Sequence, residues 1–162
     1  MIIFERKPPR LNSRMLASFV LKASSAAGLR GEVSVLITGN SDIRHLNSCF
    51  REKNQPTDVL SFPAAPSAKG LAGDIAVSLD IAASNARLLG HSVSDEIRIL
   101  ILHGILHLAG YDHESDRGEM AEKEILLRRR FALPTGLIER SSHRPTQDKP
   151  AKAAPLLARS RR

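Results

Sequence analysis

The sequence predicts an α+β domain in which helices pack on a small sheet. Two observations predict this class. Short β-prone runs dominate the first half of the 162 residues, and helical patterns fill most of the second half. Apolar residues make up 42% of the chain and charged residues 25%, as in an ordinary globular protein that is long enough to bury a core.

The individual elements follow from hydrophobic periodicity and from the glycines and prolines that interrupt it. Apolar residues at helical spacing predict helices over residues 11–27, 41–50, 79–89, 94–109 and 116–131, and β-prone runs predict strands over 32–37, 57–62 and 74–78. We expect a mostly parallel, four-stranded sheet packed with about five helices. The helix over 94–109 is apolar nearly all round, which predicts that it is buried.

The positive charge of the chain is concentrated at its end. The formal net charge is +7, but residues 140–162 contain seven basic side chains and a single acidic one, Asp148. The body therefore carries only +1, and the high pI alone is a weak argument for a nucleic-acid partner. Three prolines interleaved with Ala, Arg and Lys predict that 140–162 is a disordered basic tail after a single domain over 1–139.

The sequence also indicates a compartment. Cys49 is the only cysteine, so no intramolecular disulfide can form. The first residues carry charge by Glu5 without an apolar signal-peptide core, and no apolar run approaches the ~20 residues that cross a bilayer. We therefore expect a cytoplasmic protein without a membrane partner. Aromatic residues, at 4%, are too scarce for a nucleic-acid platform built on stacked rings.

Three histidines carry the clearest chemical signal. His103 and His107 are four residues apart on a predicted helix, so both rings project from one face and can bind the same ion. Gly110 can adopt the left-handed conformation that ends a helix, and the turn would bring His113 to that ion. Three imidazoles leave one tetrahedral position open for water, which is the pattern of catalytic zinc. An apolar helix also has little other reason to carry two imidazoles.

The spacing matches the His-x-x-x-His-x-x-Gly-x-x-His pattern of metzincin proteases, with one departure. Those enzymes have a glutamate directly after the first histidine as the general base, whereas this chain has Gly104. The metal scaffold is present and the protease base is absent. Asp112 and Glu114 flank His113 and could orient an imidazole or accept a proton.

Three sequence blocks resemble the YbeY family of bacterial metal-dependent endoribonucleases. They are His103 to His113 (HGILHLAGYDH), then Leu46 to Arg51 with Pro56 to Pro63, and Gly73-Asp74-Ile75. The resemblance implies cleavage of single-stranded RNA, a role in forming the 3′ end of 16S rRNA on the small ribosomal subunit, and ribosome quality control. It also implies zinc held by the three histidines, and catalysis assisted by Arg51. No DNA substrate is expected.

The residues leave two alternatives open. One is a protease-like hydrolase, against which Gly104 argues. The other is a non-catalytic ribosome assembly factor with a structural metal, against which the open fourth position argues. His45, His91 and His143 are isolated and are expected at the surface. The run Arg128-Arg129-Arg130 is expected to be a solvated helix end.

Overall fold

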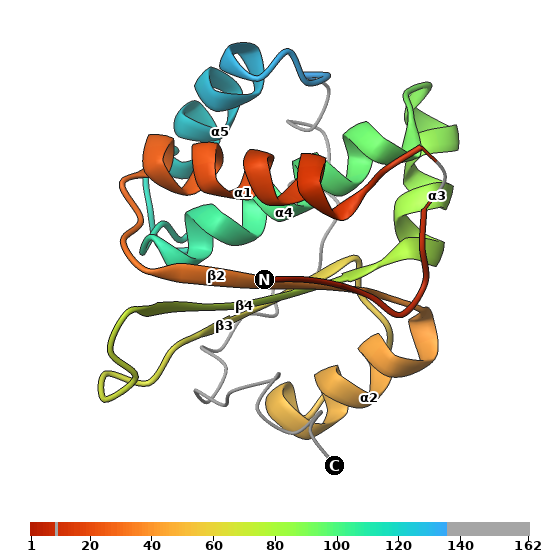
Figure 1. Ribbon diagram of the computed structural model, residues 1–162, viewed down its shortest axis with the longest axis horizontal. Coiled ribbons are helices and arrows are strands. Elements are labelled where there is room, and N and C mark those ends of the chain that lie inside the picture. The colour runs from red at the N-terminus through yellow and green to blue at the C-terminus, as the bar shows by residue number, and fades with distance from the viewer. Residues whose placement is uncertain (9, 136–162) are drawn as a thin grey trace.

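The computed structural model describes residues 1–8 and 10–135, which form four strands and five helices (Figure 1). In chain order these are β1 (Ile2–Phe4), α1 (Ser13–Ala27), β2 (Glu32–Thr38), α2 (Asn40–Arg51), β3 (Val59–Pro63), β4 (Leu71–Ser78), α3 (Leu79–Leu89), α4 (Val93–Leu108) and α5 (Glu119–Arg130). The predicted α+β class is confirmed. The predicted tail, 140–162, lies outside the described residues.

The sheet has the order β1-β2-β4-β3. β1 and β4 both run parallel to β2, but β3 runs antiparallel to β4, so the sheet is mixed rather than mostly parallel. The reason lies in the chain connections. β3 and β4 are joined directly by residues 64–70, and a short connection of this kind can only link antiparallel strands, whereas parallel neighbours need a crossover helix.

The pattern in the sequence does not reveal where the fourth strand lies. β1 has three residues, too few to show the alternation that identifies a strand. It pairs with β2 from Ile2 opposite Val35 to Phe4 opposite Ile37. The terminal ammonium of Met1 extends this pairing by donating a hydrogen bond to the Val33 carbonyl at 3.0 Å. β1 is therefore fixed by its partner strand rather than by its own sequence.

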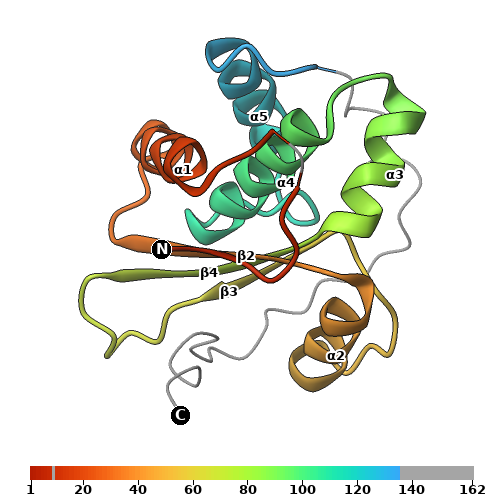
Figure 2. The ribbon, with the colours of Figure 1, turned by 45° about the vertical axis from the view of Figure 1, so that its right-hand side comes forward.

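The helices form unequal layers on the two faces of the sheet. Figure 2 shows α1, α3, α4 and α5 on one face and α2 alone on the other. The larger core lies between the four helices and the sheet, and includes Val35, Ile37 and Val77. A smaller one lies under α2, where Ile43 packs against Leu60 and Phe62. None of the helices in the described part of the chain is long and apolar enough to span a membrane.

α4 is the central helix of the larger layer, as its apolar sequence predicts. It contacts α1, α3 and α5 as well as β3 and β4. Its buried residues are Glu96, Ile97, Ile99, Leu100, Ile101, Leu102, Gly104, Ile105 and Leu106. The helix begins at the Ser92 side chain, which accepts a hydrogen bond from the Asp95 N–H at 3.0 Å. The position of α4 thus depends on packing on nearly all its sides.

At Gly104 the backbone of α4 lies close to the sheet. A Cβ atom there would lie 2.9 Å from the Ser61 Oγ, closer than real Cβ contacts, and 3.0 Å from the Ile75 Cδ1, which is tighter than most of them. The Gly104 carbonyl accepts a hydrogen bond from the Ser61 hydroxyl at 3.4 Å. The missing side chain therefore allows direct contact between the helix backbone and β3.

This contact predicts that Gly104→Ala destabilises the protein. The new methyl group overpacks the site, which costs about 1–3 kcal/mol in free energy of unfolding. Urea denaturation of both proteins measures the difference. The sign of this change in free energy of unfolding is decisive, because alanine in an unconstrained helix stabilises the helix by roughly 0.5–1 kcal/mol relative to glycine. A more stable Gly104→Ala variant contradicts the close packing.

Asp80 joins three segments at the carboxyl end of the parallel strands. Its Oδ2 accepts a hydrogen bond from the Asn40 N–H at 2.9 Å, at the start of α2, and its Oδ1 lies 2.5 Å from the Arg6 guanidinium. Asp80 is also in the first turn of α3. The hydrogen bond from the Asn40 N–H has the largest effect and lowers the pKa of Asp80. Burial opposes it, and the hydrogen bond and charge of Arg6 lower the pKa further.

A lowered pKa makes the contribution of Asp80 to stability depend on pH. The ionised carboxylate stabilises the fold above the ordinary aspartate pKa of about 3.9, and this contribution is lost as the pH falls through the lower folded-state pKa. Asp80→Asn removes the charge at two helix N-termini and should lower the free energy of unfolding at neutral pH by about 0.3–1 kcal/mol. Urea midpoints across pH should show the gap to wild type closing at acid pH. A gap that persists there excludes the charge as its origin.

Candidate metal centre

The end of α4 directs the chain so that the three histidines meet. After Leu108 the Gly110 N–H donates to the His107 carbonyl at 3.0 Å, and the Tyr111 N–H donates to the Leu106 carbonyl at 3.0 Å. Gly110 has a φ of 93°, in the left-handed region where glycine is favoured. The predicted glycine turn after the helix is confirmed. It reverses the chain just before His113.

Asp112 shapes the turn that carries His113. Its Oδ1 accepts a hydrogen bond from the Glu114 N–H at 3.0 Å, and its Oδ2 accepts one from the Ser115 hydroxyl at 2.9 Å. The Glu114 N–H is the main cause of a lowered pKa of Asp112, followed by the Ser115 hydroxyl. Both carboxylate oxygens of Asp112 therefore bind groups of the same turn, and the Glu114 side chain lies exposed at the surface.

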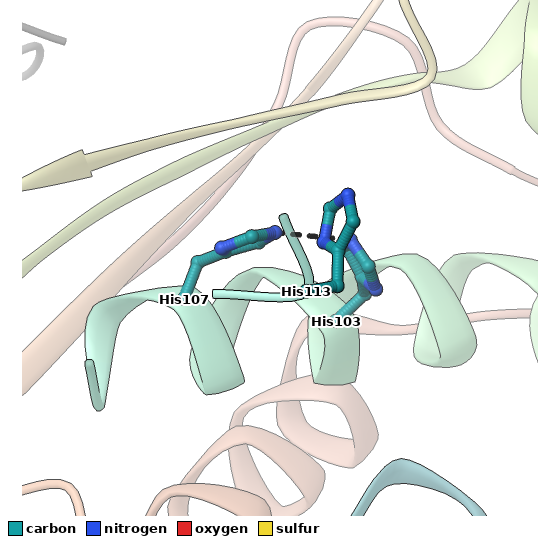
Figure 3. Close-up of side chains that lie close together, drawn as sticks. All are labelled: His103, His107 and His113. Atoms are coloured by element: carbon teal, nitrogen blue, oxygen red, sulfur yellow. Dashed lines mark hydrogen bonds between the residues drawn. The ribbon is translucent and has the colours of Figure 1, made fainter. Parts of the chain in front are cut away.

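The three imidazole rings lie together (Figure 3). The ring centroids of His103 and His107 are 4.8 Å apart, and that of His113 lies 5.5 Å from the first and 5.2 Å from the second. One nitrogen from each ring lies within 4.8 Å of the other two. Figure 3 shows the rings of His103 and His107 projecting from the same side of α4, with the His113 ring beside them. We call these three residues the histidine cluster.

The geometry of the histidine cluster fits a metal ion. The Nε2 atoms of His103 and His107 are 3.1 Å apart. Two imidazole nitrogens bound to one tetrahedral zinc ion at about 2.0–2.1 Å would be separated by roughly 3.3 Å. The Nδ1 of His113 is buried without a hydrogen-bond partner among the described residues. An ion at the centre of the cluster is the kind of group that satisfies such a nitrogen.

The carboxylate that contacts the histidine cluster comes from α5. The Oε2 of Glu124 lies 2.9 Å from the Nδ1 of His103, and its Oε1 accepts a hydrogen bond from the Arg128 guanidinium. Burial raises the pKa of Glu124, but the hydrogen bond and charge of His103, with the charge and hydrogen bond of Arg128, outweigh it and lower the pKa to about 2. The group therefore remains ionised at neutral pH.

Glu124 was detectable from helical spacing, although the sequence motif does not include it. It lies between Met120 and Leu127 at i, i+4 and i+7, so a glutamate occupies the apolar face of α5. Arg128 follows four residues later. The expectation that Arg128 is part of a solvated helix end is wrong, because this side chain is 1% exposed and its guanidinium also donates to the Pro134 carbonyl at 3.2 Å.

Arg51 lies at the end of α2, on the other face of the sheet from α4. Its NH2 group donates to the Ser61 carbonyl at 3.5 Å, at the edge strand β3. The Ser61 hydroxyl in turn contacts the carbonyl of Gly104, the residue after His103. The structure therefore brings Arg51 and α4 to the same residue of β3, and the side chain is only half-buried.

The histidines outside the cluster have different surroundings. The expectation of a surface position is wrong for His91, whose Nε2 lies 2.7 Å from the Oε2 of the fully buried Glu96. His45 is exposed, and its Nε2 lies 3.6 Å from the Cys49 Sγ on the same helix. His143 lies outside the described residues. The His91 side chain, on the connection between α3 and α4, is only 11% exposed because its ring contacts the Glu96 carboxylate.

Comparisons with known proteins agree on one family. The family described as Endoribonuclease YbeY matches residues 6–132. Relatives of that name from Koribacter versatilis and Solibacter usitatus are 51% and 45% identical, over 95% and 86% of this chain and 96% and 92% of their own lengths. A solution structure of a Thermotoga maritima protein aligns with a TM-score of 0.54 at 30% identity, covering 88% of this chain and 94% of that one. The chain belongs to the YbeY family.

Proposed function

We propose that this protein is a metal-dependent endoribonuclease that cleaves single-stranded RNA. In the cell it acts in the cytoplasm on the small ribosomal subunit, where it matures the 3′ end of 16S rRNA and takes part in ribosome quality control. The observation that carries the proposal is the histidine cluster, with nitrogens within 4.8 Å of one another, in a chain of a family described as an endoribonuclease. RNA rather than DNA is the expected substrate.

The histidine cluster is the proposed site of one zinc ion. His103 and His107 supply Nε2 atoms from α4, and His113 supplies the third nitrogen from the loop. Such an ion, when bound, supplies Lewis-acid chemistry that activates water and polarises a phosphoryl oxygen. Imidazole ligands also suit nickel or copper, so zinc is proposed from its common three-histidine sites.

Arg51 is the proposed catalytic side chain. Phosphodiester cleavage builds negative charge on the phosphoryl oxygens, and a guanidinium stays protonated and can bind two of them at once. One terminal nitrogen of the Arg51 guanidinium donates to the Ser61 carbonyl at the edge strand β3, and the side chain is half-buried. A charge positioned before the reaction stabilises the transition state without a reorganisation cost.

Two structural observations argue against the two alternative functions. A protease-like mechanism needs a general base after His103, but a side chain at Gly104 would point at Ser61 and Ile75. An assembly factor with a structural metal needs a fourth protein ligand, since structural zinc sites are closed. The cluster found among the described residues has three ligands. Both observations favour the nuclease.

Arg51→Ala should abolish most RNA cleavage while leaving the metal site loaded. Loss of one preorganised charge-stabilising group typically lowers kcat about 10²–10³-fold. The assay is cleavage of single-stranded RNA with a 3′-extended 16S end, at equal bound metal. Arg44→Ala is the matched control, because Arg44 is an exposed arginine on the same helix that donates to Asn54. Equal losses in both variants argue against a specific role for Arg51.

Metal removal should stop cleavage and lower stability together. A chelator is expected to abolish RNA cleavage, and added Zn²⁺ to restore it. Bound metal should raise the free energy of unfolding by about 2.7 kcal/mol when free Zn²⁺ is 100-fold above the dissociation constant. His107→Ala should weaken both effects. Zinc-dependent stability without any cleavage, even with ribosomal subunits added, identifies an assembly factor instead, and zinc-dependent peptide cleavage identifies a protease.

A further inference from the structure

A buried chain of polar groups runs from α5 to the histidine cluster. Arg128 is 1% exposed and Glu124 is 9% exposed, and both lie on the face of α5 that packs into the core with Met120 and Leu127. A buried charge is costly unless it is paired and hydrogen-bonded. The position of these two side chains beside His103 therefore calls for a reason beyond helix packing.

Both oxygens of Glu124 are already engaged. The Arg128 guanidinium donates to Oε1, and His103 approaches Oε2 with its Nδ1 at 2.9 Å. Arginine has donors only and does not lose its proton in proteins. A buried guanidinium therefore holds the carboxylate in its ionised form and fixes its direction.

The contact sets the proton position on His103. An ionised carboxylate accepts hydrogen bonds and cannot donate them, so the Nδ1 of His103 must carry the proton. In the neutral ring this leaves a lone pair on Nε2, the atom that lies 3.1 Å from the Nε2 of His107. Ring orientation and tautomer are thus both suited to a metal ligand.

α5 itself is anchored independently of the cluster. The ring of Phe131, just after the helix, packs edge-on against Phe19 of α1 at a centroid distance of 5.4 Å. Arg128 accepts a hydrogen bond at its carbonyl from the Leu133 N–H at 2.8 Å, and the Arg128 guanidinium donates to the Pro134 carbonyl. The packing of α5 therefore determines where Glu124 lies.

We propose that Glu124, held by Arg128, is a positioning residue that fixes His103 as a metal ligand through its Nδ1 proton. The inference rests on the proposed metal site of the nuclease. It assigns to α5 a part in metal binding, although α5 contributes no ligand.

Glu124→Gln is the most direct test. Because Arg128 offers only donors, the glutamine oxygen turns to Arg128 and its NH₂ group faces His103. The Nδ1 must then accept, and the proton moves to Nε2, where it competes with the metal. We expect Zn²⁺ to bind about 10–100-fold more weakly, measured by competition with a chromophoric chelator on the full-length protein. Nitrogen-15 NMR of the metal-free protein should show the His103 proton on Nδ1 in wild type and on Nε2 in the variant.

Two further proteins separate positioning from folding. Glu122→Gln changes an exposed glutamate on the same helix and should leave the Zn²⁺ affinity within about twofold of wild type. A double variant, Glu124→Leu with Arg128→Met, replaces the buried pair by apolar side chains, an exchange that often preserves stability. It removes the acceptor from His103 and should also weaken Zn²⁺ binding about tenfold or more.

The outcomes separate this inference from the nuclease proposal, because zinc affinity is measured without RNA. Wild-type Zn²⁺ affinity in both Glu124 variants overturns the positioning role even if RNA is cleaved. A wild-type His103 with its proton on Nε2, or a wild-type protein that binds no Zn²⁺, overturns it as well. Weakened Zn²⁺ binding in both variants supports it, even if the wild type cleaves no RNA and the nuclease proposal fails.

Discussion

Close packing of α4 against the sheet determines where the histidine cluster lies. The helix is buried on most of its surface, and at Gly104 its backbone touches β3 through the Ser61 hydroxyl. His103 is the adjacent residue and His107 follows one turn later, so the contact that orients Gly104 toward the sheet also sets the direction of both imidazoles. A rotation of α4 about its axis would move Gly104 away from Ile75 and the histidines away from His113. The packing of α4 in the core therefore also determines the geometry of the histidine cluster.

Polar contacts then fix the neighbours of this buried helix. Near its start, the fully buried Glu96 is bound by His91 and by the Asn85 side chain, which joins α3 to α4. Further along, Glu124 of α5 contacts His103, and Arg128 pairs with Glu124. Apolar packing alone permits some sliding between helices. Displacing one partner of a buried ionic contact strongly destabilises the protein, because the other charge is left buried and unpaired. These contacts fix how α3 and α5 are placed on the helix that carries the site.

Local patterns in the sequence were sufficient for the elements that carry the histidines. α4 shows its burial in nearly continuous apolar residues, and the glycine turn after it is visible as Gly110, so the cluster could be predicted from spacing. Other features depend on neighbours that the histidine motif does not include. β1 is a strand only because β2 pairs with it, and Glu124 and Arg128 look like surface charges until Met120 and Leu127 reveal that their face of α5 is buried. The position of the His91 ring likewise requires knowing that Glu96 faces inward.

The same packing explains why a metzincin-like histidine spacing occurs here without the glutamate of a protease. Position 104 faces Ser61 and Ile75, so a carboxylate there would be driven into the sheet rather than toward the cluster. Asp112 is already engaged by the turn that it shapes. A reaction at this site therefore cannot depend on a base in the protease position. Phosphodiester chemistry relies more on neutralising the charge that develops on phosphorus, for which a metal ion and a fixed guanidinium are well suited. The close contact at Gly104 thus excludes a glutamate base at this position, and the role proposed for Arg51, which contacts Ser61 on β3, does not require one.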